Sequence, residues 1–327
     1  MIHRLPGIFF YATLALLDIG CAFDLAYAQT FPVKPVRFIV CFAPGGSTDT
    51  VARIVAAALS ERWGQQVVVD NRPGGGTIIS TELTARAAPD GHTFLIVDPS
   101  FAINPGLYKK LPYDPLRDFA PVTVLASFPL MLVVHPSVPA KSVQDLIALA
   151  HAKPGVLTYA SAGIGGSSHM APEILKNLAH IDIVHIPYKG GGPAVIDLIA
   201  GQVSSAFQGI PAVLQHVRAG KLRALAVSSG KRSAIVPDVP TVAEGGLPGY
   251  EVISWQGIFT PSGVPSAIVA RLQAELASVA NLAEIKSKMA ALGAEPVGST
   301  PEQFLAYLKS QMETYASVIR AAGIKPE

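Results

Sequence analysis

The chain of 327 residues is half hydrophobic and 15% charged, with a formal net charge of +2. This length allows two ordinary domains with ample cores, and the composition excludes an intrinsically disordered chain. No cluster of Lys or Arg stands out, which argues against nucleic acid as a partner, because neutralising phosphates requires a basic face.

The first 28 residues have the features of a secretory signal peptide. Arg4 supplies a positive start, residues 8–17 form an apolar core, and an Ala-Tyr-Ala run ends at Ala28. We therefore expect cleavage after Ala28 and a mature periplasmic protein that is not embedded in the membrane. A membrane anchor is an alternative, but the apolar run is too short to span a bilayer comfortably. Lipid attachment at Cys21 is a further alternative, which the residues before that cysteine disfavour.

Removal of this segment would leave a single cysteine, Cys41, inside an apolar run. One cysteine cannot form an internal disulfide, and no positive partner stands beside it to lower its thiol pKa. We predict a buried structural thiol and not a catalytic one.

Strand-like and helix-like stretches then alternate. The expected strands are residues 36–42, 66–69 and 93–97, and the expected helices between them are 49–63 and 77–88. This order predicts a parallel sheet with helices on both faces.

A proline-rich connection follows at residues 104–115, and we expect an ordered surface excursion there because prolines prevent a long helix. Residues 122–126 and 130–135 are expected to be extended segments that carry the chain away from the first sheet, and the second of them begins the second domain.

The second half repeats the alternation. One helix is expected to begin after Ser142, a second to run through Leu178, and two more to begin at Pro193 and at Pro211. The expected strands are residues 156–160, 181–186, 204–208 and 222–227. Residues 237–250 read as a return crossing that leads into an extended segment at 252–259. Helices at 266–279, 282–292 and 301–321, the last with Thr300 as N-cap, would close the chain. Two crossings between domains form a hinge, and hinged domains close on ligands.

Two glycine-rich loops of similar design occur in the two halves. The first is PGGSTD at residues 44–49, and the second is SAGIGGSS at residues 161–168. Each follows an apolar run and leads into a helical pattern, so each presents backbone N–H groups without partners at a helix start. We expect the two loops to hold the carboxylate of one small ligand between them.

Catalytic and cofactor motifs are missing from the sequence. The serines of the second loop lack the G-x-S-x-G spacing of a hydrolase. H-E-x-x-H, cysteine-rich metal spacing, a dinucleotide-binding glycine motif and a P-loop are also absent. We expect no cofactor and no metal, and an enzyme of the hydrolase class is the weaker alternative to a binding protein.

Further motifs follow in a characteristic order. They are PGGSTD with Ala52 and Arg53, NRPG at 71–74, NP at 104–105 with LPYD at 111–114, SAG at 161–163 with Gly165 and His169, PYKG at 187–190, Asp197 and Leu198 with Gly201, and SW at 254–255 with Gly257. In this set the chain resembles the Bug-type solute receptors, the extracytoplasmic binding proteins of tripartite tricarboxylate transporters. The resemblance covers essentially the whole mature chain.

This resemblance implies an α/β type II periplasmic-binding-protein fold, with two Rossmann-like domains, a hinge and an interdomain cleft. Domain 1 would comprise residues 29–129 and 253–327, and domain 2 residues 130–252. The resemblance also implies a small carboxylated ligand, held by the loops after the first strand of each domain and partly through ordered waters.

The candidate ligand contacts combine these loops with residues at the ends of other expected strands. They are Phe42, Ala43, Gly45, Gly46, Ser47, Asp49, Asp98, Ser100, Ser161, Ala162, Gly163, Gly165, Ser167, Ser168, His169, Tyr188 and Gln208. Tyr188 would offer a phenol at the cleft rim. Lys189, although positive, is expected to point to solvent.

Asp98 departs from the usual pattern of the family, whose members often carry small polar residues in this segment. As a carboxylate facing the cleft, it would repel a second carboxylate on a ligand and attract an amine. We therefore expect an amino acid, or another carboxylate with a cationic group, in preference to a tricarboxylate.

These features predict a monomeric receptor that captures a small carboxylate by domain closure and presents it to a membrane permease of the tripartite tricarboxylate type. The alternative partner is a membrane sensor, because both roles require the same clamp.

Overall fold

The computed structural model describes residues 31–291, 293–321 and 324. The predicted signal peptide, its cleavage site and Cys21 lie outside these residues.

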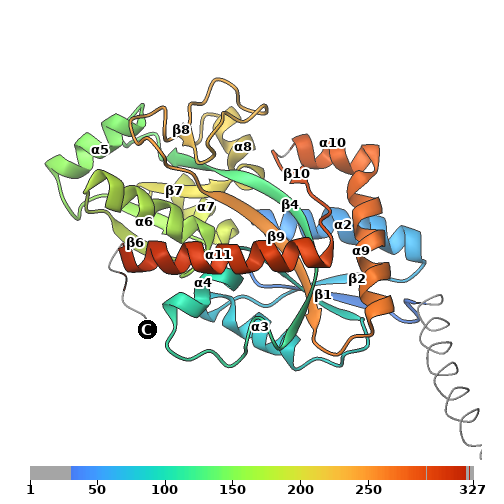
Figure 1. Cartoon of the computed structure of the whole chain (residues 1–327). Helices are drawn as coiled ribbons and strands as arrows, with labels where there is room; N and C mark the ends of the chain where they lie inside the picture. Colours follow the sequence, from blue (N-terminus) through green and yellow to red (C-terminus); the bar gives the residue numbers. More distant parts are fainter. Residues whose placement is uncertain (1–30, 292, 322–323, 325–327) are drawn as a thin grey trace, which may run out of the picture.

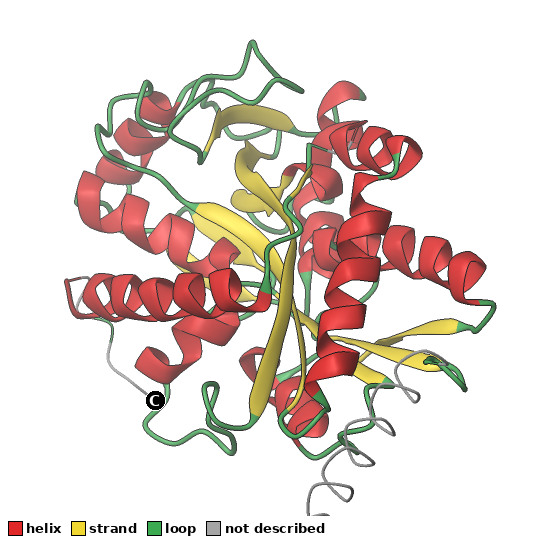
Figure 2. Cartoon of the chain, turned by 45° about the vertical axis from the view of Figure 1, so that its right-hand side comes forward, coloured by secondary structure: helices red, strands yellow, loops and turns green. Residues whose placement is uncertain are grey.

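A curled mixed sheet runs through the molecule (Figure 1). In the described residues ten strands follow the order β2-β1-β3-β9-β4-β7-β5-β6, with β8 and β10 also paired to β4. Their bounds are β1 Val36–Val40, β2 Val67–Asn71, β3 Thr93–Val97, β4 Phe119–Val134, β5 Thr158–Ser161, β6 Val184–Pro187, β7 Ser205–Gly209, β8 Arg223–Val227, β9 Ile253–Pro261 and β10 Glu295–Pro296. Helices lie on both sides of this sheet (Figure 2).

The first half of the sheet has the expected parallel arrangement. β1 pairs in parallel with β2 and with β3. The connections contain α2 (Ser47–Trp63), the short 3-10 helix η1 (Gly75–Thr77) and α3 (Ile78–Ala85). Gly64 ends α2 in the left-handed conformation, with φ +62°.

The second half repeats this design. β5 pairs in parallel with β6 and β7, and the helices are α5 (Val143–Ala152), α6 (Ser167–Ala179), α7 (Gly191–Ile199) and α8 (Ile210–Arg218). Ser142 caps α5 as expected, since its side chain accepts a hydrogen bond from the Asp145 N–H over 3.1 Å. We call the half around β1 the first lobe and the half around β5 the second lobe.

One long strand joins the two lobes. β4 pairs with β9 along residues 119–129 and with β7 and β8 along residues 130–134. Both predicted segments are therefore extended, and the structure joins them through residues 127–129 into one strand. Pro129 is tolerated within this strand because it lies where the pairing with β9 ends, opposite Ile253.

The proline-rich connection contains a helix that the sequence did not predict. α4 (Ser100–Leu107) forms although it contains Pro105, and it buries the side chains of Phe101 and Ile103. α4 packs against α11 (Pro301–Ala321), and this packing offsets the loss of the backbone hydrogen bond that a proline removes. The expectation of a surface excursion holds only after this helix.

The C-terminal segment returns to the first lobe. α9 (Ser266–Asn281), α10 (Ala283–Ala291) and α11 follow β9, close to the predicted bounds. Thr300 caps α11 as expected. Its side chain accepts from the Gln303 N–H, and the Gln303 side chain accepts from the Thr300 N–H in return. Two-residue β10, which pairs with β4, was not predicted.

Candidate ligand-binding site

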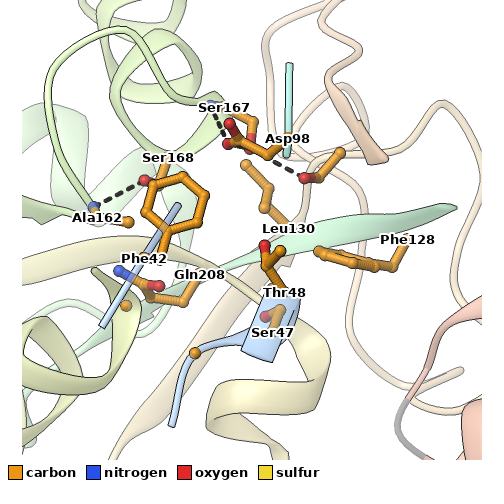
Figure 3. Close-up of a pocket in the computed structure, with 14 residues that line it drawn as sticks. Phe42, Ser47, Thr48, Asp98, Phe128, Leu130, Ala162, Ser167, Ser168 and Gln208 are labelled. Atoms are coloured by element: carbon orange, nitrogen blue, oxygen red, sulfur yellow. Dashed lines mark hydrogen bonds between the residues drawn. The ribbon is translucent and has the colours of Figure 1, made fainter. Parts of the chain in front are cut away.

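Four helices begin around one small cavity between the lobes. α2 starts after Gly46, α6 after Gly166, α7 after Gly190 and α8 after Gly209. The cavity has a volume of about 40 Å³. It is lined by Phe42, Gly46, Ser47, Thr48, Asp98, Phe128, Leu130, Ala162, Ser167, Ser168, Gly191, Gln208, Gly209 and Ser254 (Figure 3).

This arrangement favours an anion through backbone groups. The first N–H groups of a helix have no acceptor within the helix, and the helix dipole adds partial positive charge at the same end. Among the residues that the structure describes, no Lys or Arg lines the cavity. A carboxylate here would therefore be held by oriented N–H groups and hydroxyls.

The first loop is held in shape by Asp49. Its Oδ2 atom accepts hydrogen bonds from the Gly45 N–H and from Arg53 Nε, each over 3.0 Å, and Oδ1 accepts from Asn71 Nδ2 over 2.9 Å. Although burial opposes it, these hydrogen bonds lower the pKa of Asp49. Since its carboxylate is fully engaged and does not line the cavity, Asp49 supports the loop from behind.

Ser168 and His169 hold the second loop in a similar way. The Ser168 hydroxyl accepts from the Ala162 N–H over 2.9 Å, and His169 Nδ1 accepts from the Gly165 N–H over 3.2 Å. The His169 ring stacks on His185, with ring centroids 4.3 Å apart. Burial lowers the pKa of both imidazoles, so both are neutral near pH 7.

The lobes touch directly beside the cavity. The Ala43 N–H donates to the Lys189 carbonyl oxygen over 2.9 Å. A Cβ atom at Gly192 would overlap the Pro44 carbonyl oxygen, so only glycine allows this approach. The chain is therefore in a closed arrangement.

Asp98 closes the cavity from the first lobe. Its Oδ1 accepts from the Ser100 N–H over 2.9 Å, and its Oδ2 accepts from the N–H of Ser167 over 3.3 Å. The Ser167 hydroxyl lies 3.5 Å from the same oxygen and 3.0 Å from the Ser254 hydroxyl. Burial raises the pKa of Asp98, although these hydrogen bonds oppose the shift. The carboxyl group of Asp98 thus occupies the start of α6, where a ligand anion would also be favoured.

Gln208 presents an unsatisfied donor to the cavity. The residue is 3% exposed, lines the cavity, and its Nε2 atom has no hydrogen-bond partner among the described residues. A buried amide without a partner costs free energy, and a ligand carboxylate would supply the missing acceptor.

The structure brings about half of the predicted contacts to the cavity wall. Those on the wall are Phe42, Gly46, Ser47, Asp98, Ala162, Ser167, Ser168 and Gln208. Those off it are Ala43, Gly45, Asp49, Ser100, Ser161, Gly163, Gly165, His169 and Tyr188.

The residues off the wall have identifiable tasks. The Ser161 hydroxyl lies 2.6 Å from His185 Nε2. The Tyr188 hydroxyl donates to Asp197 over 2.7 Å, which engages the phenol that was expected to contact a ligand. Lys189 is exposed, as expected. Cys41 is buried and burial raises its pKa, as expected of a structural thiol.

Sequence reasoning missed Thr48, Phe128, Leu130, Gly191, Gly209 and Ser254. Gly191 begins α7, and Gly209 ends β7 directly before α8. A glycine between a strand and a helix is the signal that identified the two main loops. Phe128, Leu130 and Ser254 lie on the strands that join the lobes, and their side chains reach the cavity because β4 and β9 run past it.

Two further properties bear on the kind of site. Among the described helices, none has the length and apolar character needed to span a bilayer. Within the same part of the chain, no group of three or more His, Cys, Asp or Glu side chains is placed to hold a metal ion.

Comparison with known proteins gives the family. The model of the tripartite tricarboxylate transporter family receptor matches residues 51–324. Protein BugT of Bordetella pertussis is 39% identical over 300 residues, covering 91% of this chain and 92% of its own.

Solved structures agree with the fold. The structure of R. palustris Rpa4515 with adipate has a TM-score of 0.88 at 36% identity, covering 91% of this chain and 100% of its own. That of MatC from Rhodopseudomonas palustris with bound malate has a TM-score of 0.85 at 33% identity, covering 88% and 100%. The two-lobed α/β fold is therefore that of periplasmic binding proteins, and the chain belongs to the tripartite tricarboxylate transporter receptor family.

Proposed function

We propose that this protein is a periplasmic receptor that binds a small carboxylate between its lobes. The observation that carries this proposal is the meeting of four helix N-termini at one cavity. In the described part of the chain this cavity has no Lys or Arg in its wall, and the buried amide of Gln208 lacks an acceptor. Relatives with similar structures hold adipate and malate, which supports a carboxylic acid as the ligand class.

Capture would involve movement of the two lobes. A cavity of about 40 Å³ has room for a few waters, so a dicarboxylate must enter while the lobes are apart. We assign residues 29–129 and 253–327 to domain 1 and residues 130–252 to domain 2. This division is supported by β4, which changes partners between Pro129 and Leu130, and by β9, which begins at Ile253.

The receptor would deliver its ligand to a membrane permease, as the family name implies, and a membrane sensor is the alternative partner. A receptor that opens and closes works as a monomer, and we propose that state. Export behind a signal peptide cleaved after Ala28 would place it in the periplasm.

We propose that the protein is not an enzyme. Ser161 and His185 form a hydroxyl–imidazole pair of the kind found in hydrolases. However, Ser161 is 0% exposed and does not line the ligand cavity, so a substrate in the cavity would not reach its hydroxyl. The pair instead supports the loop that follows β5.

A thermal-shift screen of the exported form tests the proposal. Mono-, di- and tricarboxylates, amino acids and aromatic acids would be compared with neutral compounds of the same size. A ligand at a hundredfold its Kd stabilises the fold by about 2.7 kcal/mol, which gives a clear rise in Tm. Stabilisation by neutral compounds alone would contradict the proposal.

A further inference from the structure

A second, larger cavity lies next to the carboxylate cavity. Its volume is about 390 Å³, which falls within the range of small-molecule sites. The two cavities share Phe42 and Ala162 as wall residues. We call this larger space the side chamber.

Both lobes build the side chamber. The first lobe contributes the end of β1, the loop at residues 74–78 and Tyr108, and the second lobe contributes residues 162–164 and 187–189. These segments follow the carboxyl ends of strands in the two parallel sheets, where α/β proteins bind ligands. The lobes come together here, since a Cβ at Gly76 would lie 3.0 Å from the carbonyl oxygen of Ile164. The chamber is therefore complete only in the closed arrangement.

The walls of the side chamber are mostly apolar. Phe42, Ile78, Ile164 and the Tyr108 ring supply hydrocarbon surface, and Lys189 is the one charged residue among the lining residues. Such a wall suits a hydrocarbon chain, because removing apolar surface from water is favourable.

The two cavities differ in the part of a ligand that each can hold. The carboxylate cavity, at about 40 Å³, accommodates the head of a ligand and little more, whereas the side chamber is about ten times larger. We propose that the side chamber holds the apolar body of the ligand while its carboxylate sits at the helix N-termini. This inference rests on the proposed function and narrows the ligand class to carboxylates with an extended hydrocarbon chain.

Isothermal titration of the full mature chain with acetate, butyrate, hexanoate and adipate tests this assignment. We expect Kd to fall about fourfold for each added methylene, the ratio that corresponds to burying one CH₂ group. Ile164→Trp, which fills the chamber, should remove this dependence on chain length and leave acetate binding unchanged. Ile196→Trp is the matched control, because Ile196 is 67% exposed, lines neither cavity, and should behave like the wild type.

A second variant covers the case in which the tryptophan prevents folding. Ile164→Ala should weaken hexanoate binding several-fold while acetate binding is unchanged. A wild-type Kd that is the same for acetate, butyrate and hexanoate would overturn the inference, as would binding of adipate without hexanoate, and both results would leave the receptor function intact. Failure of every carboxylate to bind would overturn the proposed function, and the role of the chamber with it.

Discussion

At the scale of single residues, Asp98 is the acid that shapes the charge of the cavity. Its carboxyl group accepts from the N–H of Ser167 at the start of α6, so it stands where a ligand anion would also bind. A second ligand carboxylate close to it would meet like charge. This contact is the physical basis for expecting a ligand with an amine or a single carboxylate near Asp98.

We expect Asp98→Asn to lower Kd for dicarboxylates about tenfold, or about 1.4 kcal/mol, and to weaken amino acids. Because burial raises the pKa of Asp98, wild-type affinity for dicarboxylates should increase as pH falls and the group takes up a proton. Affinity of the variant should lack this dependence. Titration calorimetry across pH measures both effects.

Asp238→Asn is the control, since Asp238 is exposed and lines neither the carboxylate cavity nor the side chamber. Unchanged preference between dicarboxylates and amino acids in Asp98→Asn would refute the selective role of Asp98.

Gln208 gives a second prediction at this scale. Gln208→Met keeps the side-chain length and removes an Nε2 donor that has no partner in the described structure. We expect unchanged or slightly higher Tm, because the substitution breaks no hydrogen bond of that donor within the protein and removes the cost of burying it without a partner. Carboxylate affinity should fall at least tenfold, since hydrogen bonds to charged groups contribute about 1.5–3 kcal/mol.

Gln256→Met is the matched control for this variant. Gln256 is fully buried on β9, both of its amide atoms lack partners among the described residues, and it does not line the cavity. Equal effects of the two substitutions on affinity would argue against a ligand contact by Gln208.

At the scale of elements, the start of α7 reports on closure. Gly192 lies within the helix, so alanine there suits the local backbone and improves helix propensity by up to about 1 kcal/mol. Its Cβ would nevertheless overlap the Pro44 carbonyl oxygen of the other lobe. We expect Gly192→Ala to preserve Tm and to weaken ligand binding at least tenfold by blocking closure.

Gly64→Ala should show the reverse pattern. Gly64 has φ +62° and nothing within 4 Å of a Cβ, so alanine costs about 1 kcal/mol of stability and leaves affinity unchanged. Calorimetry and thermal melts of both variants separate the effects, and wild-type affinity in Gly192→Ala would contradict closure through this contact.

The histidine pair behind the second loop makes stability depend on pH. Burial, with the charge of His169 as a smaller cause, lowers the pKa of His185 to about 3. The unfolded chain takes up a proton near pH 6.5 while the folded chain does not. Stability should therefore fall as pH decreases below about 6.5, down to about 3.

His185→Phe keeps a ring against Tyr159 and should flatten this slope, although it removes the partner of Ser161. His151→Gln, on the exposed face of α5, is the comparison. Tm measured against pH gives the slopes, and equal slopes for wild type and His185→Phe would exclude this origin.

Sequence reasoning succeeded where an element has a local signal. α2, α6 and α7 each follow an apolar run and a glycine, and the structure places all three starts at the cavity. It failed where tertiary packing decides, as for α4, which forms around Pro105 by packing against α11, about 200 residues further along the chain.

At the scale of the whole molecule, the two-lobed fold could be predicted because strands and helices alternate twice in the sequence. The wall residues on β4 and β9 could not be predicted in the same way. Phe128 on β4 and Ser254 on β9 line the cavity because these two strands pair beside it, and neither residue stands at a glycine-rich helix start.

The helix N-termini that meet at the cavity should select a carboxylate over an uncharged ligand. The most direct test of this selectivity is isothermal titration of the mature chain with the best carboxylate from the screen and with the primary amide of the same skeleton. We predict at least a hundredfold weaker binding of the amide, about 2.7 kcal/mol, because the amide lacks the negative charge that the N–H groups and helix dipoles favour. Equal affinity for acid and amide would contradict this selectivity.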